Sequence, residues 1–363
     1  MPPPVDAPAL PNPRGAPARA AAAPLAVPGR QLPAPPPAAV RPPAPGAASL
    51  DPVTIKLGYQ IPNFSYGTGV ENLFPTVVAQ AREAEASGFD TVLVMDHFYQ
   101  LPGIGTPDQP MLECYTALAA LAGATSTIQL SALVTGNTYR NPAILAKTVT
   151  TLDVVSAGRA ILGIGAGWFE REHLDYGIEF GTFTDRFVRL EEALNIITPM
   201  LRGENPTYEG QWYTVNGAMN EPRLRPSIPV MLGGSGEKKT FRLAARFADH
   251  MNIICDAADI PAKVAALRQR CEEIGRDPST LATSYLGFVY TVEDRAQVDA
   301  FWARVPEDRR DRIFAGTPDD VAEQLRTRVL DQGIDGLTIN MPFNGHQPGV
   351  VARAGEVLRG LFA

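Results

Sequence analysis

The sequence predicts an α/β protein with a (β/α)8 barrel fold, on two observations. From Thr54 onward, short apolar runs alternate with amphipathic segments, and the alternation yields eight strand-helix units. These units span about 310 residues, which fits barrels of about 250 residues with insertions. A doubly wound open sheet is the alternative, because the sequence does not indicate whether the eighth strand pairs with the first.

The expected strands are short and rich in aliphatic and β-branched residues, as parallel strands buried on both faces are. In chain order they cover residues 54–60, 91–96, 128–136, 160–166, 229–234, 250–255, 284–292 and 336–342. The second is the most informative, because its apolar run ends on Asp96 and is followed by His97.

Amphipathic segments between the strands predict helices, and several of them end at Gly, which favours the turn that closes a helix. They cover residues 73–88, 116–125, 141–158, 185–201, 238–248, 262–275 and 317–333. Residues 206–227 break the alternation, because polar and aromatic residues alternate there around Gly210 and Gly217. This pattern predicts a small β-hairpin insertion, which either shapes the mouth of a site or decorates the surface.

Composition separates the start of the chain from the rest. Residues 1–48 are almost entirely Pro, Ala and Gly with a few Arg, and such a segment cannot offset the entropy of ordering by burying side chains. We therefore expect a disordered Pro/Ala-rich tail over residues 1–50 and the barrel domain over residues 51–363. Prolines interrupt every apolar run of the tail, which argues against a signal peptide, and no later run reaches the roughly 18 residues of a membrane span.

Charge and cysteine content narrow the choice of partners. A formal net charge of −7 without a basic run argues against nucleic acid and membranes and favours a small-molecule substrate, with a homodimer left open. Cys114, Cys255 and Cys271 are odd in number and scattered, so neither a disulfide framework nor a zinc site is indicated and a reducing cytoplasm is expected. No histidine lies in a metal-binding spacing, so no metal is expected.

Asp96 and His97 are the main candidates for chemistry. They follow a buried strand, and in parallel α/β folds the C-terminal ends of the strands form the ligand site. With an ordinary pKa near 6.5, His97 can give or take a proton near neutral pH. The alternative is a hydrogen-bonded positioning role. The other histidines have structural explanations, because His250 opens a strand while His173 and His346 lie in polar loops.

Two glycine-rich segments follow expected strands. Gly163, Gly165 and Gly167 have the spacing G-x-G-x-G, which differs from the G-x-G-x-x-G of dinucleotide folds. Residues 233–236, Gly-Gly-Ser-Gly, lead from a strand into a helix, where backbone N–H groups and the helix dipole favour phosphate. A P-loop would need Gly at the position of Glu237, so an NTPase is not expected; a simple tight turn is the alternative to phosphate binding.

Five stretches together resemble the luciferase-like monooxygenase superfamily, and most closely its branch that depends on coenzyme F420, a deazaflavin. They are VLVMDHF at 92–98, the block 132–173, RFVRLEEALNII at 186–197, TYEGQWY at 207–213 and VMLGGSGEKKT at 230–240. The resemblance covers residues 54–345 in order and omits the tail. It implies a TIM barrel that carries a flavin or deazaflavin across the C-terminal mouth of its strands.

The resemblance also implies roles for individual residues. His97 matches the catalytic histidine near the reactive ring of the cofactor. The implied cofactor-binding residues are Asp96 beside it, Leu133 and Val134 in a bulge behind the ring that often has a non-proline cis peptide, Gly165, Ala166, Gly167 and Trp168 in a loop that borders the cofactor, and Gly233, Gly234, Ser235 and Gly236 in a phosphate-side turn.

Two further features qualify this comparison. Trp168 departs from relatives that place a carboxylate there, and Glu170 and Glu172 are weaker candidates for that acid. Arg140 is expected to pair either with an anionic part of the cofactor or in a salt bridge at a helix start, and Glu113 to favour a helix N-terminus.

The function expected from these residues is that of a coenzyme F420-dependent oxidoreductase. It would transfer a hydride between the deazaflavin and a small organic substrate, with His97 moving the proton. A monooxygenase that uses reduced FMN and oxygen is the first alternative. A non-catalytic barrel that binds a flavin or deazaflavin is the second, because a fold alone does not prove activity.

Overall fold

The order of the strands closes on itself in the part of the chain that the computed structural model describes, residues 55–363. The barrel path, parallel throughout, runs β1 (Leu57–Ile61), β2 (Thr91–Val94), β3 (Gln129–Ala132), β5 (Ala160–Gly165), β8 (Val230–Gly234), β9 (His250–Ile253), β10 (Ala282–Thr291), β12 (Gly336–Asn340) and back to β1. The (β/α)8 barrel is thus confirmed over the open sheet.

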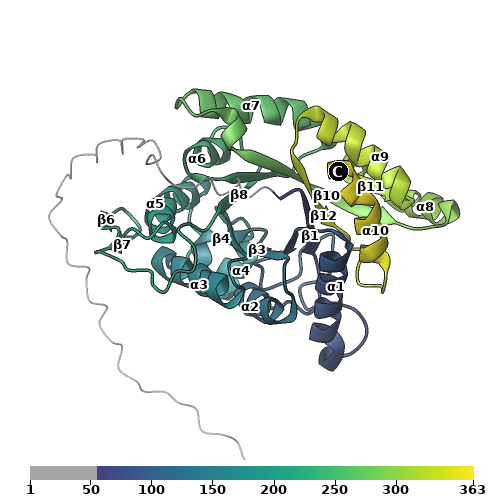
Figure 1. Cartoon of the computed structure of the whole chain (residues 1–363), viewed down its shortest axis with the longest axis horizontal. Coiled ribbons are helices and arrows are strands. Elements are labelled where there is room, and N and C mark those ends of the chain that lie inside the picture. Colours follow the sequence, from purple (N-terminus) through teal and green to yellow (C-terminus); the bar gives the residue numbers. More distant parts are fainter. Residues whose placement is uncertain (1–54) are drawn as a thin grey trace, which may run out of the picture. The chain divides into compact units, whose positions relative to one another are not determined.

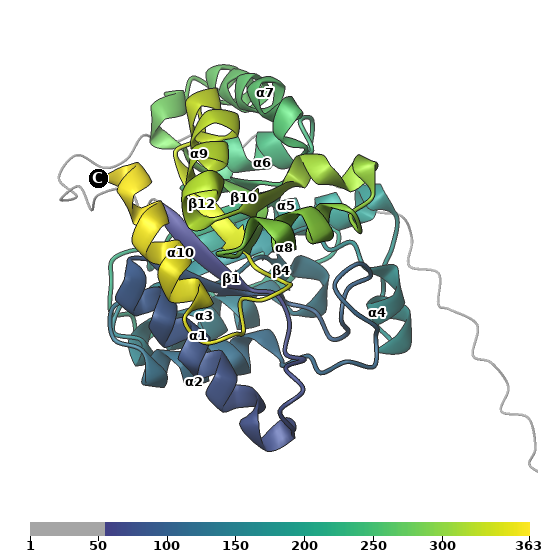
Figure 2. The same ribbon diagram turned by 90° about the vertical axis from the view of Figure 1, so that its right-hand side faces the viewer.

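Helices surround these strands in both views (Figure 1, Figure 2). Those that the amphipathic pattern predicted are α1 (Leu73–Ser87), α2 (Cys114–Ala124), α3 (Pro142–Val155), α5 (Phe183–Leu201), α6 (Thr240–Phe247), α7 (Ile260–Glu272) and α9 (Pro318–Arg328). Local chemistry sets several of their ends. Helix α1 stops at Gly88, which has a φ of 102°, and α5 starts with a capping box between Thr182 and Asp185.

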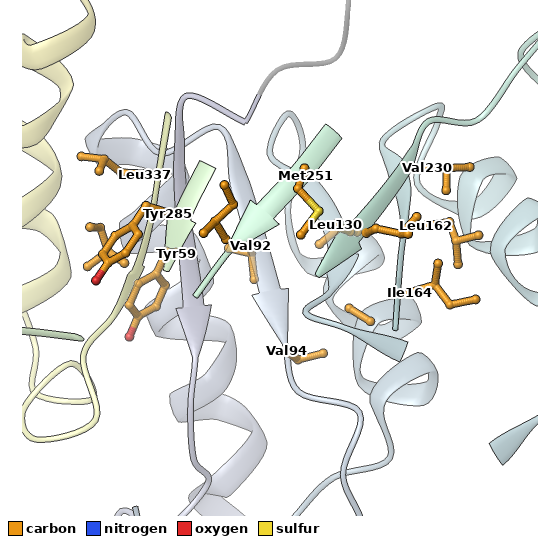
Figure 3. Close-up of a cluster of buried hydrophobic side chains, with 14 of the residues drawn as sticks. Tyr59, Val92, Val94, Leu130, Leu162, Ile164, Val230, Met251, Tyr285 and Leu337 are labelled. Atoms are coloured by element: carbon orange, nitrogen blue, oxygen red, sulfur yellow. The ribbon is translucent and has the colours of Figure 1, made fainter. Parts of the chain in front are cut away.

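Apolar side chains pack on both faces of the strands. Figure 3 shows the layer between barrel and helices, to which Val92, Leu130 and Leu162 contribute from successive strands. A second cluster lies inside the barrel and contains Leu93 and Met231. Burying a side chain of this size contributes about 1.5–3 kcal/mol, which explains why these strands read as nearly continuous apolar runs.

Some elements were not expected from the sequence. They are β11 (Ile313–Gly316), α4 (Glu170–Asp175), α8 (Arg295–Trp302) and α10 (Val350–Leu358). The strand expected over residues 128–136 is interrupted, and its last two residues form β4 (Thr135–Gly136), which pairs with β5. Strand β11 pairs with the C-terminal half of β10, beyond the barrel itself. The predicted hairpin insertion is confirmed, because β6 (Tyr208–Glu209) and β7 (Thr214–Val215) form a separate antiparallel pair.

Two sequence predictions concern the N-terminal tail and membrane-spanning segments. The expected tail, residues 1–50, lies outside those residues, so the division into tail and barrel domain stays a proposal. Within residues 55–363, no helix is both long and apolar enough to cross a membrane.

Candidate active site

The C-terminal ends of the barrel strands enclose a cavity of about 370 Å³. It lies where parallel α/β folds build ligand sites. Of the residues that the sequence analysis selected, eight line the cavity: Asp96, His97, Leu133, Val134, Gly167, Trp168, Gly233 and Gly234. The structure thus brings together residues from four loops that are far apart in the chain, although their roles toward a ligand stay predictions.

The other four selected residues, Gly165, Ala166, Ser235 and Gly236, do not belong to the lining. Gly165 has a clear packing function instead. A Cβ there would lie 2.9 Å from Cγ2 of Val134, and a Cβ at Gly233 would lie 2.7 Å from its Cγ1. These two glycines therefore leave the space that the Val134 side chain occupies, a purpose that the spacing of glycines did not reveal.

His97 is held by a buried glutamate from helix α4. Its Nδ1 lies 2.9 Å from Oε2 of Glu172, and its side chain keeps 13 % of its surface exposed while that of Glu172 has none. The backbone N–H groups of Phe98 and Tyr99 donate to Oε1 of Glu172 at 2.6 and 2.8 Å, and the Tyr139 hydroxyl donates to Oε2. Each oxygen of the Glu172 carboxylate therefore has two hydrogen-bond partners, as a buried carboxylate requires.

These hydrogen bonds set the protonation state of Glu172. Burial acts to raise the pKa of its carboxyl, but the hydrogen bonds from His97, Tyr139 and the Tyr99 backbone lower it, and the net effect is a lowered pKa. Glu172 is therefore a carboxylate near neutral pH and can only accept. Nδ1 of His97 must then carry a proton, which leaves Nε2 as the nitrogen that can exchange one.

Asp96 lines the same cavity but is already paired. Arg140 donates to its Oδ2 and Oδ1 at 2.6 and 2.9 Å, and the Gly136 N–H donates to Oδ2 at 3.0 Å. Arg140 also binds Glu113 at 2.6 Å, while Glu113 caps α2 through the Thr116 N–H. Of the two partners expected for Arg140, the structure gives the salt bridge within the protein.

Carboxamides form a polar part of the cavity that the sequence analysis missed. The Asn340 amide donates to Oε1 of Gln60 at 2.7 Å, and the Gln60 amide donates to the Leu133 carbonyl at 3.2 Å. The Leu133–Val134 peptide bond is cis, as the resemblance implied. Oδ1 of Asn340 is buried without a hydrogen-bond partner. A signal for these residues existed, because a lone amide near the end of an apolar strand is uncommon.

The remaining histidines are structural. His173 was expected in a polar loop, which is wrong: it is buried in α4, 2.7 Å from the Thr138 hydroxyl and 2.8 Å from the Phe169 carbonyl. His250 lies inside the barrel beside Ser284 at 2.7 Å, and burial lowers its pKa to about 3. His346 stacks on Tyr66.

Comparison with known proteins decides the family. Residues 55–305, most of the chain, match the family model described as luciferase-like monooxygenase. The chain belongs to this family. It is therefore an oxidoreductase of the luciferase-like type, and the fold and family expected from the sequence are both confirmed.

Relatives and solved structures agree with this assignment. The chain is 28 % identical over 78 % of its length to a protein of Nakamurella multipartita named F420-dependent glucose-6-phosphate dehydrogenase, covering 92 % of it. It is 31 % identical over 77 % of its length to a protein of the same name from Kineococcus radiotolerans, covering 81 % of it.

Similar solved structures support the barrel fold. An F420-dependent secondary alcohol dehydrogenase has a TM-score of 0.69 at 20 % identity, with 85 % of this chain and 98 % of that one aligned. EDTA monooxygenase from Chelativorans has a TM-score of 0.73 at 18 % identity, with 85 % and 95 % aligned.

The luciferase-like barrel thus places an oriented imidazole at the cavity. His97 packs edge-on against Trp168 and Phe169, with ring centroids 5.7 and 5.9 Å apart. Glu172 fixes the imidazole from one side and these aromatic rings from the other. Nε2 of His97 has no hydrogen-bond partner among residues 55–363, so it is free for a ligand.

Proposed function

We propose that this chain is a coenzyme F420-dependent oxidoreductase that transfers a hydride between the deazaflavin and a small organic substrate. The observation that carries the proposal is the pair His97 and Glu172, which presents one oriented imidazole nitrogen at the mouth of a luciferase-like barrel. The names of the relatives, which are F420-dependent dehydrogenases, support the choice of cofactor.

The cavity has features that fit a flat heteroaromatic ring. Gly234 allows close approach of a ligand to the backbone, since no side chain projects from it, whereas Val134 fills the space beside Gly233. The partnerless Oδ1 of Asn340 offers an acceptor to a ring N–H group, and burying such an atom without a partner costs about 1–3 kcal/mol. Leu133 and Val134 would support the ring, and residues 233–236 would hold the phosphate.

The chain's own residues would move the proton of the reaction. The bound deazaflavin supplies hydride chemistry. Nε2 of His97 would take the hydroxyl proton when an alcohol is oxidised, or return a proton when a carbonyl, imine or activated double bond is reduced. The Glu172 carboxylate would stabilise the imidazolium and hold its orientation, while Trp168 and Phe169 limit the access of water.

An anaerobic assay separates this proposal from its two competitors. The purified full chain is mixed with reduced F420 and a panel of ketones and enones, and the visible absorbance of the oxidised deazaflavin is followed. We expect it to appear without oxygen. Turnover that requires reduced FMN and oxygen would favour the monooxygenase, and tight F420 binding without turnover of any substrate would favour the non-catalytic barrel.

We also propose that the chain forms a homodimer and works in the cytoplasm. The outward faces of α2 and α3 support the dimer, because Ile144 and Val155 are exposed beside an apolar groove of about 580 Å³. Cys114, Cys255 and Cys271, all buried as free thiols, support a reducing location. Exclusion of nucleic acid rests on the net charge of −7 and stays a prediction.

A further inference from the structure

The cavity changes in character from its floor to its mouth. Gln60, Asn252 and Asn340 line it and are almost completely buried, so they belong to its deep end. Leu101 and Ile104 line it and are half-buried, and Trp168 has 60 % of its surface exposed. The cavity therefore has buried carboxamides at its floor and more exposed apolar side chains at its mouth.

The apolar mouth is built by separate segments. Leu101 and Ile104 come from the loop after β2, Trp168 from the loop after β5, and Phe288 from β10. Trp168 stacks on Phe169 at 5.2 Å and meets the edge of His97 at 5.7 Å. The surface next to the proton-transfer group is therefore hydrocarbon and aromatic ring. Its burial by an apolar ligand is favourable in proportion to the area removed from water.

The charges of the lining disfavour an anionic substrate. Asp96 is the carboxylate of the cavity, and the guanidinium that neutralises it, Arg140, already donates to Asp96 and Glu113. Among residues 55–363, no lysine or arginine belongs to the lining. Arg309 lies beside Gly103 but is exposed, and solvent screens a charge in that position. A buried phosphate would lack the paired charge that it needs.

We infer that the substrate is an uncharged, largely apolar alcohol, ketone, imine or enone rather than a phosphorylated sugar. This inference rests on the proposed function, since it assigns the deep, polar part of the cavity to the cofactor. It separates the chain from relatives named for glucose 6-phosphate, to which it is similar in sequence but whose substrate does not suit this mouth.

The inference is tested by comparing two sets of probes on the full chain. One contains neutral secondary alcohols and ketones such as cyclohexanol and cyclohexanone, and the other contains glucose 6-phosphate and short carboxylic acids. With F420 bound, we expect the best neutral probe to exceed every anionic probe at least about 100-fold in kcat/KM, because the mouth would bury an anion without a paired cation. An anionic probe that exceeds all neutral ones would overturn the inference.

Binding provides a second readout that does not depend on turnover. Trp168 lines the cavity, so neutral probes should change the tryptophan fluorescence of the chain, and Trp168→Phe should remove that change. Because this measurement works without cofactor, it reports on the substrate class even if F420 fails to bind. Failure of F420 to bind would contradict the proposed function, whereas preferential binding of sugar phosphate would contradict only the substrate class.

A matched pair of variants locates the effect. Ile104→Arg places a cation in the mouth and should lower kcat/KM for the neutral probe at least about tenfold. It should also raise the ratio of kcat/KM for anionic probes to kcat/KM for the neutral probe. Ile274→Arg introduces the same side chain after α7, away from the cavity, and should change neither value. Equal behaviour of the two variants would show that residue 104 does not contact substrate.

Discussion

The hydrogen bond between His97 and Glu172 determines which imidazole nitrogen is available to a ligand. A carboxylate that accepts from Nδ1 fixes the tautomer, so Nε2 bears the lone pair that takes a proton. The same bond prevents rotation of the ring. His97 therefore has two properties that the proposed general base needs, namely a nitrogen without a hydrogen-bond partner among residues 55–363 and a defined direction.

Replacing His97 by Asn should slow the reaction far more than it weakens cofactor binding. Asn keeps a hydrogen-bonding group but cannot take a proton near neutral pH, and general acid-base help is typically worth 10²- to 10⁴-fold in rate. We expect the rate of hydride transfer, measured by stopped-flow absorbance, to fall at least about 100-fold. Near-normal turnover, or a defect confined to cofactor affinity, would make His97 a positioning residue.

Replacing Glu172 by Gln should lower both the rate and the stability. The variant keeps the shape but turns one acceptor oxygen into a donor, which faces the donors of His97, Phe98, Tyr99 and Tyr139. We expect a loss of about 1–3 kcal/mol of unfolding free energy at pH 7. Glu170→Gln, at an exposed position of the same helix, should change neither quantity and is the control.

Acid should reduce the difference in unfolding free energy between the Glu172→Gln variant and the wild type. The pKa of Glu172 is lower in the folded protein than in the unfolded chain, so its stabilisation is complete above the ordinary glutamate pKa of about 4.3. That stabilisation is lost as the pH falls through the lowered pKa of the folded state. Denaturant unfolding at pH 7 and at a pH of about 3, below the ordinary glutamate pKa, checks this. An unfolding free-energy difference that is equal at both pH values would contradict the lowered pKa.

At the scale of elements, the turn from β8 to α6 is the expected phosphate site. Gly234 has a φ of 140°, which favours Gly, and the turn leads into the N-terminus of α6. Gly234→Val should weaken F420 binding about tenfold more than it weakens binding of a ring analogue without phosphate. Gly275→Val, also at a positive φ but after α7, controls for strain. Equal losses for both ligands would move the phosphate site elsewhere.

Strands and helices could be predicted where the local sequence pattern determines them, whereas the candidate site could be predicted only in part. Apolar runs identified the strands, so His97 could be selected as a residue at a strand end. Its partner Glu172 lies 75 residues away on a six-residue helix too short to show periodicity, and Gln60 and Asn340 are 280 residues apart. Such pairs meet only when the barrel closes. Strand β11 was missed because its apolar run is confined to residues 313–315, which is too short to distinguish from a loop.

For the whole molecule, the apolar groove along α2 and α3 is the expected contact between two copies. Two chains of net charge −7 approach with less repulsion at a groove whose lining, within residues 55–363, contains no carboxylate. Lys147 is the charged residue of the groove, and its amine already donates to the Glu221 carbonyl. Val155→Glu should convert a dimer to a monomer in light scattering, whereas Ile274→Glu should not. A wild-type monomer at high concentration would refute the contact.

The central claim, that this luciferase-like barrel uses coenzyme F420, is tested most directly by an equilibrium titration. The purified full chain is titrated in parallel with oxidised F420 and oxidised FMN, and the fluorescence of each cofactor is recorded. We predict saturable binding of F420 at one site per chain, at least about tenfold tighter than that of FMN. Saturable binding of FMN with no detectable binding of F420 would contradict the claim.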